Sequence, residues 1–366
     1  MRVLIGMPDK DSRGGPIYCE PPFVAALREA GVEADEETYV YGDDVSIIQR
    51  SLRVVKAASR LHRRARLRDY DVIHLNTSFD EKCVLRDLLT MTLLRFTRVP
   101  IHLKMHGSIA AFLQTKSSFW RHLQKRVFAM AADIGVLSSE EHELFLKAGC
   151  PTEKLSRAIN SIETEEFKKH EDFRKRQNIS DTATILLFSA RLIPTKGLLD
   201  VIDACADLNR SGREIVLFCL GDGPQLSEAE EKVRKLGMAE HICFTGYVSE
   251  TETTRFHANC DIFVFPTYHD EGLPLVLLKS LAAGTPIITT QIRASADILA
   301  DPNNCLWVKP RSPHDLAAKI ATLIDDPPLR QTMSANNRHL AARFMPIAIA
   351  KHYIDVYSAM LSRLNP

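Results

Sequence analysis

Short apolar runs alternate with longer segments of helical periodicity along the whole chain. Such alternation is typical of parallel β-sheets whose strands are joined by crossover helices. The runs predict strands at Val3–Met7, Val72–Asn76, Ile101–Met105 and Ile134–Leu137, and then at Thr184–Ser189, Ile215–Leu220, Ile242–Thr245, Ile262–Phe265 and Pro286–Thr289. Helices are predicted, among others, at Pro22–Glu29, Leu199–Asn209, Leu226–Leu236 and Pro274–Ala283. The pattern therefore predicts an α/β protein in which each half forms its own doubly wound sheet.

A polar connector divides the two halves. The chain has 366 residues, which is typical of two domains. The stretch Glu163–Asp181 is dense in charge and lacks an apolar run, as expected of an exposed linker. We therefore predict one domain over residues 1–163 and a second over residues 164–347.

Composition removes several classes of protein. Hydrophobic content is 45%, charged content is 25% and the net charge is +1, so no global field favours nucleic acid. The cysteines are scattered and none forms a C-x-x-C pair, which predicts reduced buried thiols rather than a zinc site or a redox dithiol. The opening MRVLIGMPDK is too short in apolar residues for a signal peptide. Since no apolar stretch reaches about 20 residues, we expect a cytoplasmic protein, either soluble or peripheral on the inner membrane face.

The segment Ile47–Arg68 has an unusual charge pattern. Apolar residues lie on one narrow face at 100° per residue, namely Ile47, Val54, Ala58, Leu61 and Ala65. The remainder is basic, with Arg50, Arg53, Lys56, Arg60, Arg63, Arg64, Arg66 and Arg68. Two interpretations stay open: a surface helix that packs on the sheet, or a patch for anionic lipid head groups. The first 160 residues carry an excess of bases, which favours this half as the acceptor or membrane side.

Residues suited to an anionic ligand follow several strands of the second half. Arg191 and Lys196 come just after one strand, where α/β sheets bind ligands. Gly221 and Gly223 follow the next strand, but the third glycine of a dinucleotide fingerprint is absent. The strand ending at Gly246 is followed by Tyr247 and Val248, whose backbone is placed to hold a base edge. Each of these signals taken alone is equally consistent with an ordinary loop or turn.

The segment from Glu271 to Lys279 carries the most information. A buried strand leads into Glu271, Gly272 shapes a turn, and Pro274 suits the first position of the following helix. The amino terminus of a helix offers free N–H groups and a positive dipole end, which suit a diphosphate. The Glu271 carboxylate is placed to accept hydrogen bonds from sugar hydroxyls, although it equally suits a helix start.

The order of these motifs resembles the retaining group 1 (family 4) glycosyltransferases of the GT-B fold. The motifs are Arg-x4-Lys-Gly, Gly-x-Gly-Pro, Phe-x-Gly and Glu-Gly-x-Pro-Leu-x-Leu-Leu-x-Ser-Leu-Ala-x-Gly-x-Pro. In the first half, Gly14-Gly15-Pro16, His106-Gly107 and the run Asn160–Glu163 after ADIGVLSS are similar to the same family. The resemblance implies two Rossmann-like domains facing across a cleft, with the last helix, within residues 348–366, returning to the first domain.

The resemblance also implies a role for each matching residue. His106 and Glu271 would act at the reacting centre, with His106 donating a hydrogen bond to the sugar or to developing charge. Arg191, Lys196 and the N–H groups of Leu275 and Val276 would hold the diphosphate. The remaining donor-binding positions would be Gly14, Gly15, Gly221, Tyr247, Val248, Gly272, Leu273 and Lys279. The family needs no metal and no cofactor beyond the nucleotide sugar itself.

Two positions depart from the family pattern. The family usually has a second glutamate eight residues after the first, which contacts the ribose hydroxyls; here that position is Lys279. A lysine is only a donor, so either the ribose contact differs or Lys279 reaches the diphosphate. In place of Gly-Gly-x-x-Glu the chain reads QIRASADIL, with Asp297 nearest to the expected acid.

The resemblance predicts transfer of a sugar from a nucleotide-diphosphate donor to a glycan or lipid-linked acceptor, with retention, in bacterial surface polysaccharide biosynthesis. Two alternatives stay open: a catalytically silent homologue that binds a nucleotide sugar or partner subunit, and a nucleotide-sugar epimerase. A nicotinamide oxidoreductase is disfavoured because no complete G-x-G-x-x-G follows the first strand.

Overall fold

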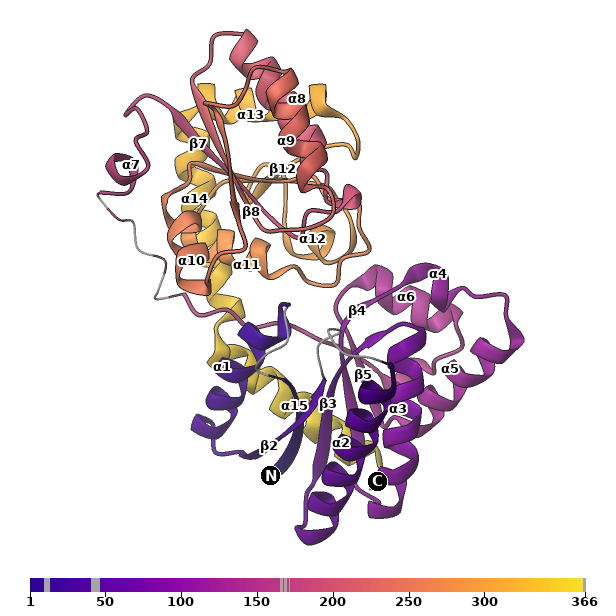
Figure 1. Ribbon diagram of the computed structural model, residues 1–366. Coiled ribbons are helices and arrows are strands. Elements are labelled where there is room, and N and C mark those ends of the chain that lie inside the picture. Colours follow the sequence, from indigo (N-terminus) through magenta and orange to yellow (C-terminus); the bar gives the residue numbers. More distant parts are fainter. Residues whose placement is uncertain (10–13, 41–46, 165–166, 168–169, 171, 365–366) are drawn as a thin grey trace. The chain divides into compact units, whose positions relative to one another are not determined.

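The computed structural model describes residues 1–9, 14–40, 47–164, 167, 170 and 172–364, which form two compact units (Figure 1). The first unit consists of Met1–Ser161, Asp270–Pro274 and Phe344–Pro366. The second consists of Ile162–His269 and Leu275–Arg343. Among the described residues, no helix is both long and apolar enough to span a membrane.

The first unit is built on a six-stranded parallel sheet in the order β2-β1-β3-β4-β5-β6. Its strands are β1 (Arg2–Pro8), β2 (Glu33–Val40), β3 (Val72–Phe79), β4 (Ile101–Ser108), β5 (Asp133–Val136) and β6 (Leu155–Arg157). Its helices are α1 (Pro16–Glu29), α2 (Ile47–Leu67), α3 (Glu81–Leu94), α4 (Ala110–Leu113), α5 (Ser118–Met130), α6 (Ser139–Lys147) and α15 (Pro346–Leu364), with short turns η1 (Arg95–Thr97) and η2 (Thr152–Lys154).

Both faces of this sheet are covered by helices, as a parallel sheet requires. One core joins the strands to α2, α3, α5 and α6. The other joins β1 to α1 and α15, where Tyr353 and Tyr357 are fully buried. The Tyr357 hydroxyl lies 2.6 Å from Nδ1 of His74 on β3, so the last helix of the chain is an integral part of the first unit.

The second unit has its own six-stranded parallel sheet in the order β12-β11-β10-β7-β8-β9. Its strands are β7 (Thr184–Ser189), β8 (Ile215–Leu220), β9 (Ile242–Gly246), β10 (Ile262–Phe265), β11 (Ile287–Thr289) and β12 (Cys305–Trp307). Its helices are α7 (Phe173–Arg176), α8 (Leu198–Arg210), α9 (Leu226–Lys235), α10 (Glu250–Asn259), α11 (Leu275–Ala283), α12 (Arg293–Ile298), α13 (Pro313–Asp325) and α14 (Pro327–Ala341), with turn η3 (Pro194–Lys196). A further turn, η4 (Ala342–Phe344), precedes α15.

The structure differs from the sequence-based expectation in three strands and one helix start. β2, β6 and β12 are absent from the prediction. β2 has the sequence EADEETYV, in which acidic residues replace the apolar run expected of a strand. β6 and β12 span only three residues each, which is too short for a recognisable pattern. α1 begins at Pro16 rather than Pro22, because Pro16 already occupies the first-turn position that proline favours. The predicted connector Glu163–Asp181 contains residues 165–166, 168–169 and 171, which lie outside the described residues, and its described part includes α7.

Candidate functional site

The strand order of the second unit indicates where a ligand binds. From β7 the chain proceeds to β8 and β9 on one side, and then returns to β10, β11 and β12 on the other. Open α/β sheets bind ligands outside the carboxyl ends of their strands where the order reverses. In this sheet the reversal falls between β7 and β10, so the loops after these two strands are the candidate site.

The loop after β7 carries Arg191 and Lys196 and is fastened to the loop after β10. Arg191 is exposed and Lys196 is half-buried, with Nζ 5.6 Å from the ring centroid of Phe265. Gly197 has φ +81°, and a Cβ there would approach the Pro266 carbonyl oxygen to 2.6 Å. The Tyr268 amide donates to the Thr195 carbonyl at 2.9 Å. Both cations are therefore presented by a fixed loop at the reversal point.

The two glycines after β8 support that loop. Gly221 has φ +126°, and a Cβ on it would lie 1.9 Å from the Ala190 carbonyl oxygen. A Cβ on Gly223 would lie 2.4 Å from the Leu192 carbonyl oxygen. The backbone of the β7 loop therefore needs glycine at both positions, irrespective of any ligand. The following β9 loop presents Tyr247, which is 57% exposed, and the half-buried Val248.

The segment after β10 divides between the two units. α11 begins at Leu275 in the second unit, and the N–H groups of its first turn, including those of Leu275 and Val276, have no partner within the helix. Asp270–Pro274, which contains Glu271, groups with the first unit. There a Cβ on Gly272 would lie 2.8 Å from the His106 carbonyl oxygen, and Asn160 Nδ2 donates to the Leu273 carbonyl at 3.1 Å. The structure thus places the backbone of Gly272, the residue after Glu271, next to the His106 carbonyl.

Lys279, the position that departs from the family pattern, makes an ion pair inside the second unit. Its side chain is only 6% exposed, and Nζ lies 2.6 Å from Oε1 and 2.7 Å from Oε2 of Glu250. Glu250 is the first residue of α10 and its side chain is 33% exposed. A carboxylate is therefore present beside position 279, but it comes from the neighbouring helix.

In the first unit the strand order reverses between β1 and β3. Gly14 and Gly15 follow β1, beyond residues 10–13, which lie outside the described part of the chain. Gly14 has φ +128°, and among the described residues only Cδ of Pro16 lies within 4 Å of the place where its Cβ would be. The Gly15 carbonyl accepts from the amides of Tyr18 and Cys19 and so starts α1. Its positive φ therefore favours glycine at position 14.

His106, near the carboxyl end of β4, lies in a buried polar network. Nε2 is 2.8 Å from Asn76 Oδ1, and Asn76 Nδ2 donates to the Gly6 carbonyl at 3.0 Å. Because that second bond makes Oδ1 the acceptor, the hydrogen of a neutral His106 lies on Nε2. The donor role implied by the family remains a prediction; in this arrangement the imidazole N–H is already donated to Asn76.

A fully buried ion pair lies beneath His106. Lys104 Nζ on β4 donates to Glu20 Oε1 on α1 at 2.6 Å, and both side chains are 0% exposed. Burial lowers the pKa of His106 to about 4, which the Glu20 carboxylate opposes and the Lys104 ammonium reinforces. His106 is therefore neutral at physiological pH, and it does not act as a charged acid.

Cys19, Glu20 and His106 also offer metal-ligand atoms that lie within 4.8 Å of one another. However, Lys104 already balances the Glu20 charge and occupies one carboxylate oxygen. Burial, and next the Glu20 charge, raise the pKa of the Cys19 thiol well above its usual range, so the thiolate that a metal needs is disfavoured. These residues fit a metal-free polar network better than a metal centre.

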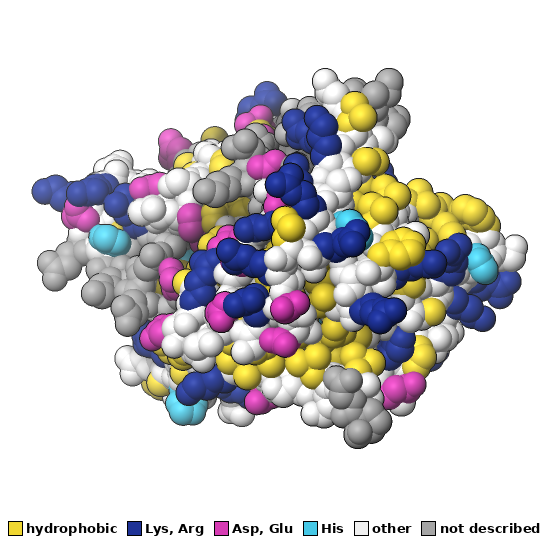
Figure 2. Space-filling view, turned by 90° about the horizontal axis from the view of Figure 1, so that it is seen from below, with side chains coloured by type: hydrophobic (Ala, Val, Ile, Leu, Met, Phe, Trp, Pro, Cys, Tyr) yellow, Lys and Arg dark blue, Asp and Glu magenta, His cyan; other side chains and the backbone are white. Residues whose placement is uncertain are grey.

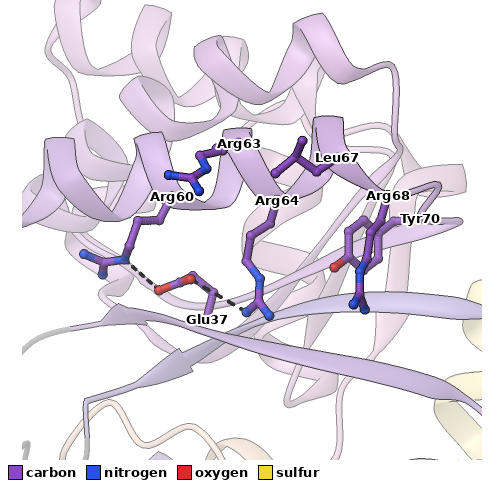
Figure 3. A pocket seen from close by; sticks show the side chains of 7 residues that line it. All are labelled: Glu37, Arg60, Arg63, Arg64, Leu67, Arg68 and Tyr70. Carbon is purple, nitrogen blue, oxygen red and sulfur yellow. Dashed lines mark hydrogen bonds and ion pairs between the residues drawn. The ribbon is translucent and has the colours of Figure 1, made fainter.

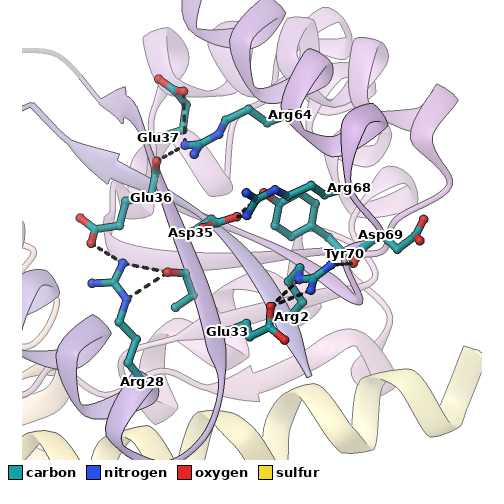
Figure 4. Close-up of polar contacts among 11 residues, drawn as sticks. Arg2, Arg28, Glu33, Asp35, Glu36, Glu37, Arg64, Arg68, Asp69 and Tyr70 are labelled. Carbon is teal, nitrogen blue, oxygen red and sulfur yellow. Dashed lines mark hydrogen bonds and ion pairs between the residues drawn. The ribbon is translucent and has the colours of Figure 1, made fainter.

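Arginines of the basic helix α2, and Arg68 just beyond its end, pair with acids of the edge strand β2. Arg60 pairs with Glu37 at 2.7 Å, Arg64 with the same carboxylate at 3.7 Å and Arg68 with Asp35 at 2.9 Å (Figure 3 and Figure 4). Arg2 of β1 and Arg28 of α1 pair with two further acids of β2, Glu33 and Glu36. Arg60, Arg63, Arg64 and Arg68 line a pocket of about 420 Å³ together with Glu37, Leu67 and Tyr70. Of the predicted apolar stripe, Ala58, Leu61 and Ala65 are buried and Val54 is half-buried, whereas the side chain of Ile47 lies outside the described residues. The described stripe residues therefore pack against the unit, as the first interpretation predicts.

Comparison with known proteins finds a family model that matches the second half of the chain. The family model "Glycosyl transferases group 1" matches residues 169–340. The chain is 23% identical to alpha-D-kanosaminyltransferase of Streptomyces kanamyceticus, over 72% of this chain and 71% of that protein. It is 28% identical to a GDP-mannose-dependent alpha-(1-6)-phosphatidylinositol monomannoside mannosyltransferase of Mycobacterium tuberculosis, over 55% of each chain. The chain thus spans little more than half the length of the second relative.

Solved structures with the same architecture include HepE of Anabaena in complex with UDP and glucose. That structure has a TM-score of 0.77 and 18% identity, and the match covers 98% of this chain and 100% of HepE. Two doubly wound units of this kind define the GT-B class of fold. The family match covers residues 169–340, so this part of the chain resembles the group 1 glycosyltransferases, and the relatives and solved structures named here are themselves glycosyltransferases or share their fold.

Proposed function

We propose that the chain transfers a sugar from a nucleoside-diphosphate donor to a glycan or lipid-linked acceptor, with retention of anomeric configuration. The observation that carries the proposal is the presentation of Arg191, Lys196 and the start of α11 at the β7–β10 reversal point. HepE, which has the same fold, binds UDP and glucose, and this supports a nucleotide sugar as the donor.

The chemistry required of this site is stabilisation of a leaving diphosphate. As the bond between the anomeric carbon and the diphosphate oxygen breaks, negative charge grows on the diphosphate. Arg191, Lys196 and the N–H groups of α11 stabilise that charge from fixed positions. The acceptor oxygen attacks from the same face, and its proton passes to the departing diphosphate oxygen. Glu271 accepts hydrogen bonds from hydroxyls of the transferred sugar.

A donor panel with matched variants tests this assignment. Wild-type protein is incubated with nucleotide sugars and glycan acceptors, and release of nucleoside diphosphate and glycosylated product are both measured. Arg191→Ala and Glu271→Ala should each lower kcat/KM by about tenfold to a hundredfold, as expected for loss of a charged hydrogen bond. Arg234→Ala, at an exposed arginine on α9, is the control and should retain activity. Full turnover in Arg191→Ala would refute the diphosphate role.

The panel also separates the two alternative functions. A silent homologue binds the donor without releasing nucleotide, and the Lys279 departure is the feature that motivates this possibility. An epimerase releases nucleotide and inverts the sugar without any acceptor. Product that keeps the donor's anomeric configuration and forms only with acceptor present supports transfer with retention.

We further propose that the acceptor lies at an anionic membrane surface and is reached through the outward side of α2. Leu52, Val55 and Leu67 are 56%, 48% and 70% exposed on this helix. Lys56, Arg63 and Arg66 are also exposed, and with Leu52 they lie opposite the buried Leu61 at 100° per residue. Figure 2 shows hydrophobic side chains interspersed with Lys and Arg on one face of the molecule. Such a mixture suits the boundary between head groups and acyl chains.

The ion pairs of α2 decide which arginines belong in the membrane experiment. Neutralising Lys56, Arg63 and Arg66 together should lower binding to anionic vesicles, because each base near such a surface contributes about 1 kcal/mol. Arg60 and Arg64 bind Glu37, so their loss perturbs β2 instead. Unchanged sedimentation of the triple variant with anionic vesicles would remove the membrane part of the proposal.

A further inference from the structure

The Lys279–Glu250 pair joins two neighbouring helices of the second unit. Lys279 lies in α11 and Glu250 opens α10, and the ammonium contacts both carboxylate oxygens at 2.6 and 2.7 Å. The two partners differ in exposure, since the Lys279 side chain is 6% exposed and that of Glu250 is 33% exposed. The Lys279 ammonium group is therefore buried, whereas the Glu250 carboxylate is partly accessible to solvent.

The place of this carboxylate in the sheet links it to the proposed donor site. α10 follows β9 through the loop that carries Tyr247 and Val248, and α11 follows β10. Both helices thus begin at the carboxyl edge of the same parallel sheet, where the β7–β10 reversal point lies. Lys279 is four residues beyond Leu275, about 6 Å along the helix from its diphosphate-binding start.

The chemistry of a carboxylate limits what it can recognise in a nucleoside diphosphate. An ionised carboxylate only accepts hydrogen bonds, and it repels the phosphates. The ribose offers two vicinal hydroxyl donors, which match the two oxygens of one carboxylate. The paired lysine fixes the carboxylate rotamer, so less side-chain freedom is lost when the hydroxyls bind.

We propose that Glu250, held by Lys279, accepts the ribose hydroxyls of the donor nucleotide. This inference rests on the proposed function, because it assigns one part of the same nucleotide site. It also accounts for the lysine at position 279, where the family resemblance predicts a carboxylate. In this chain, position 279 carries a lysine, and Glu250 of α10 provides the carboxylate that would bind the ribose.

Discrimination between ribose and deoxyribose is the direct test. Dissociation constants are measured by calorimetry for UDP, GDP and ADP and for their 2′-deoxy counterparts. Wild-type protein should bind the preferred ribonucleotide about tenfold or more tighter than its deoxy form, as expected for a charged hydrogen bond. Glu250→Gln should bring this ratio to within about threefold of unity, since a neutral acceptor forms a weaker bond.

Three further variants separate recognition from simple stabilisation. Glu252→Gln is the matched control, because Glu252 lies in the same first turn but pairs with Arg255, and its ratio should equal that of wild type. Lys279→Met should lower the ratio by releasing Glu250. The double variant Glu250→Lys/Lys279→Glu exchanges the two partners, so the ion pair remains and α11 carries the carboxylate. It should discriminate between ribose and deoxyribose better than either Glu250→Gln or Lys279→Met.

The outcomes distinguish this proposal from the proposed function. A lower melting temperature with an unchanged ribose-to-deoxyribose ratio in Glu250→Gln would overturn the ribose role and leave the donor site intact. Equal binding of ribo- and deoxynucleotides by wild-type protein would also overturn the ribose role. If wild-type protein binds none of the nucleoside diphosphates, the proposed function itself fails, and the ribose role fails with it.

Discussion

The carboxyl edges of the two sheets carry charge in opposite ways. In the second unit the cations lie on loops, with Arg191 exposed to solvent. In the first unit the charges lie under the surface, where Lys104 and Glu20 are fully buried and His106 is kept neutral above them. The comparison shows that the second unit exposes cationic charge at this edge, whereas the first unit buries its charge around one imidazole.

The largest expected effect comes from breaking the buried pair of the first unit. Lys104→Met leaves the Glu20 carboxylate buried without its counterion and should lower the free energy of unfolding by about 3–5 kcal/mol. Replacing both partners, as in Glu20→Met/Lys104→Met, should recover most of that loss because no charge remains buried. Urea unfolding of the two variants measures the difference. Equal stability of single and double variants would contradict the pairing.

The neutral state of His106 predicts a dependence of stability on pH. Its folded pKa, about 4, lies below the usual 6.5, so the unfolded chain binds the proton more readily between these values. The folded state is therefore favoured above pH 6.5, and stability falls as the pH drops toward 4, by up to about 3 kcal/mol from this residue. In His106→Gln the fall between pH 6.5 and 4 should be smaller than in wild type. Parallel curves for the two proteins would show that His106 does not titrate in this window.

The glycines of the second unit provide the next test. Gly221→Ala places a Cβ 1.9 Å from the Ala190 carbonyl at φ +126° and should destabilise the unit by about 2–3 kcal/mol. Gly212 has φ +80°, and no atom of the described residues lies within 4 Å of its Cβ position. Gly212→Ala should therefore lower the free energy of unfolding by only about 1 kcal/mol, from backbone strain. Thermal unfolding of both variants measures the two losses of stability. Gly212→Ala reports backbone strain alone, and the additional loss in Gly221→Ala reports the steric clash. A larger loss in Gly212→Ala would contradict this assignment.

The smallest expected effect concerns the surface pairs of α2. Arg64→Ala removes a partner of Glu37, and Arg63→Ala removes an exposed arginine one residue away. Exposed ion pairs contribute about 0–1 kcal/mol, so Arg64→Ala should lower the free energy of unfolding by less than about 1 kcal/mol, and Arg63→Ala by less still. Binding to anionic vesicles should decrease more in Arg63→Ala than in Arg64→Ala. If the same variant shows the larger loss in both the unfolding and the vesicle assay, Arg64 and Arg63 do not have the separate roles proposed for them.

The sequence carries much of the fold because its signals are local. Buried parallel strands such as Ile215–Leu220 are apolar throughout, and their period and flanking turns identify them without any partner. β2 was not predicted because its many acidic residues are atypical of a strand. In the structure these acids pair with arginines of β1, α1 and α2, and the local sequence of β2 does not reveal these partners. The residues proposed to bind the donor were identifiable because they occupy short loops directly after recognisable strands.

By itself, the sequence determined two doubly wound halves, the strands that precede Arg191, Lys196 and Glu271, and the family to which the chain is similar. Only the tertiary structure decided that Glu250 partners Lys279 across 29 residues and that Asn76 takes the His106 hydrogen. Periodicity reports which side of an element is buried. It does not report which distant side chain lies opposite, because that depends on how the elements pack.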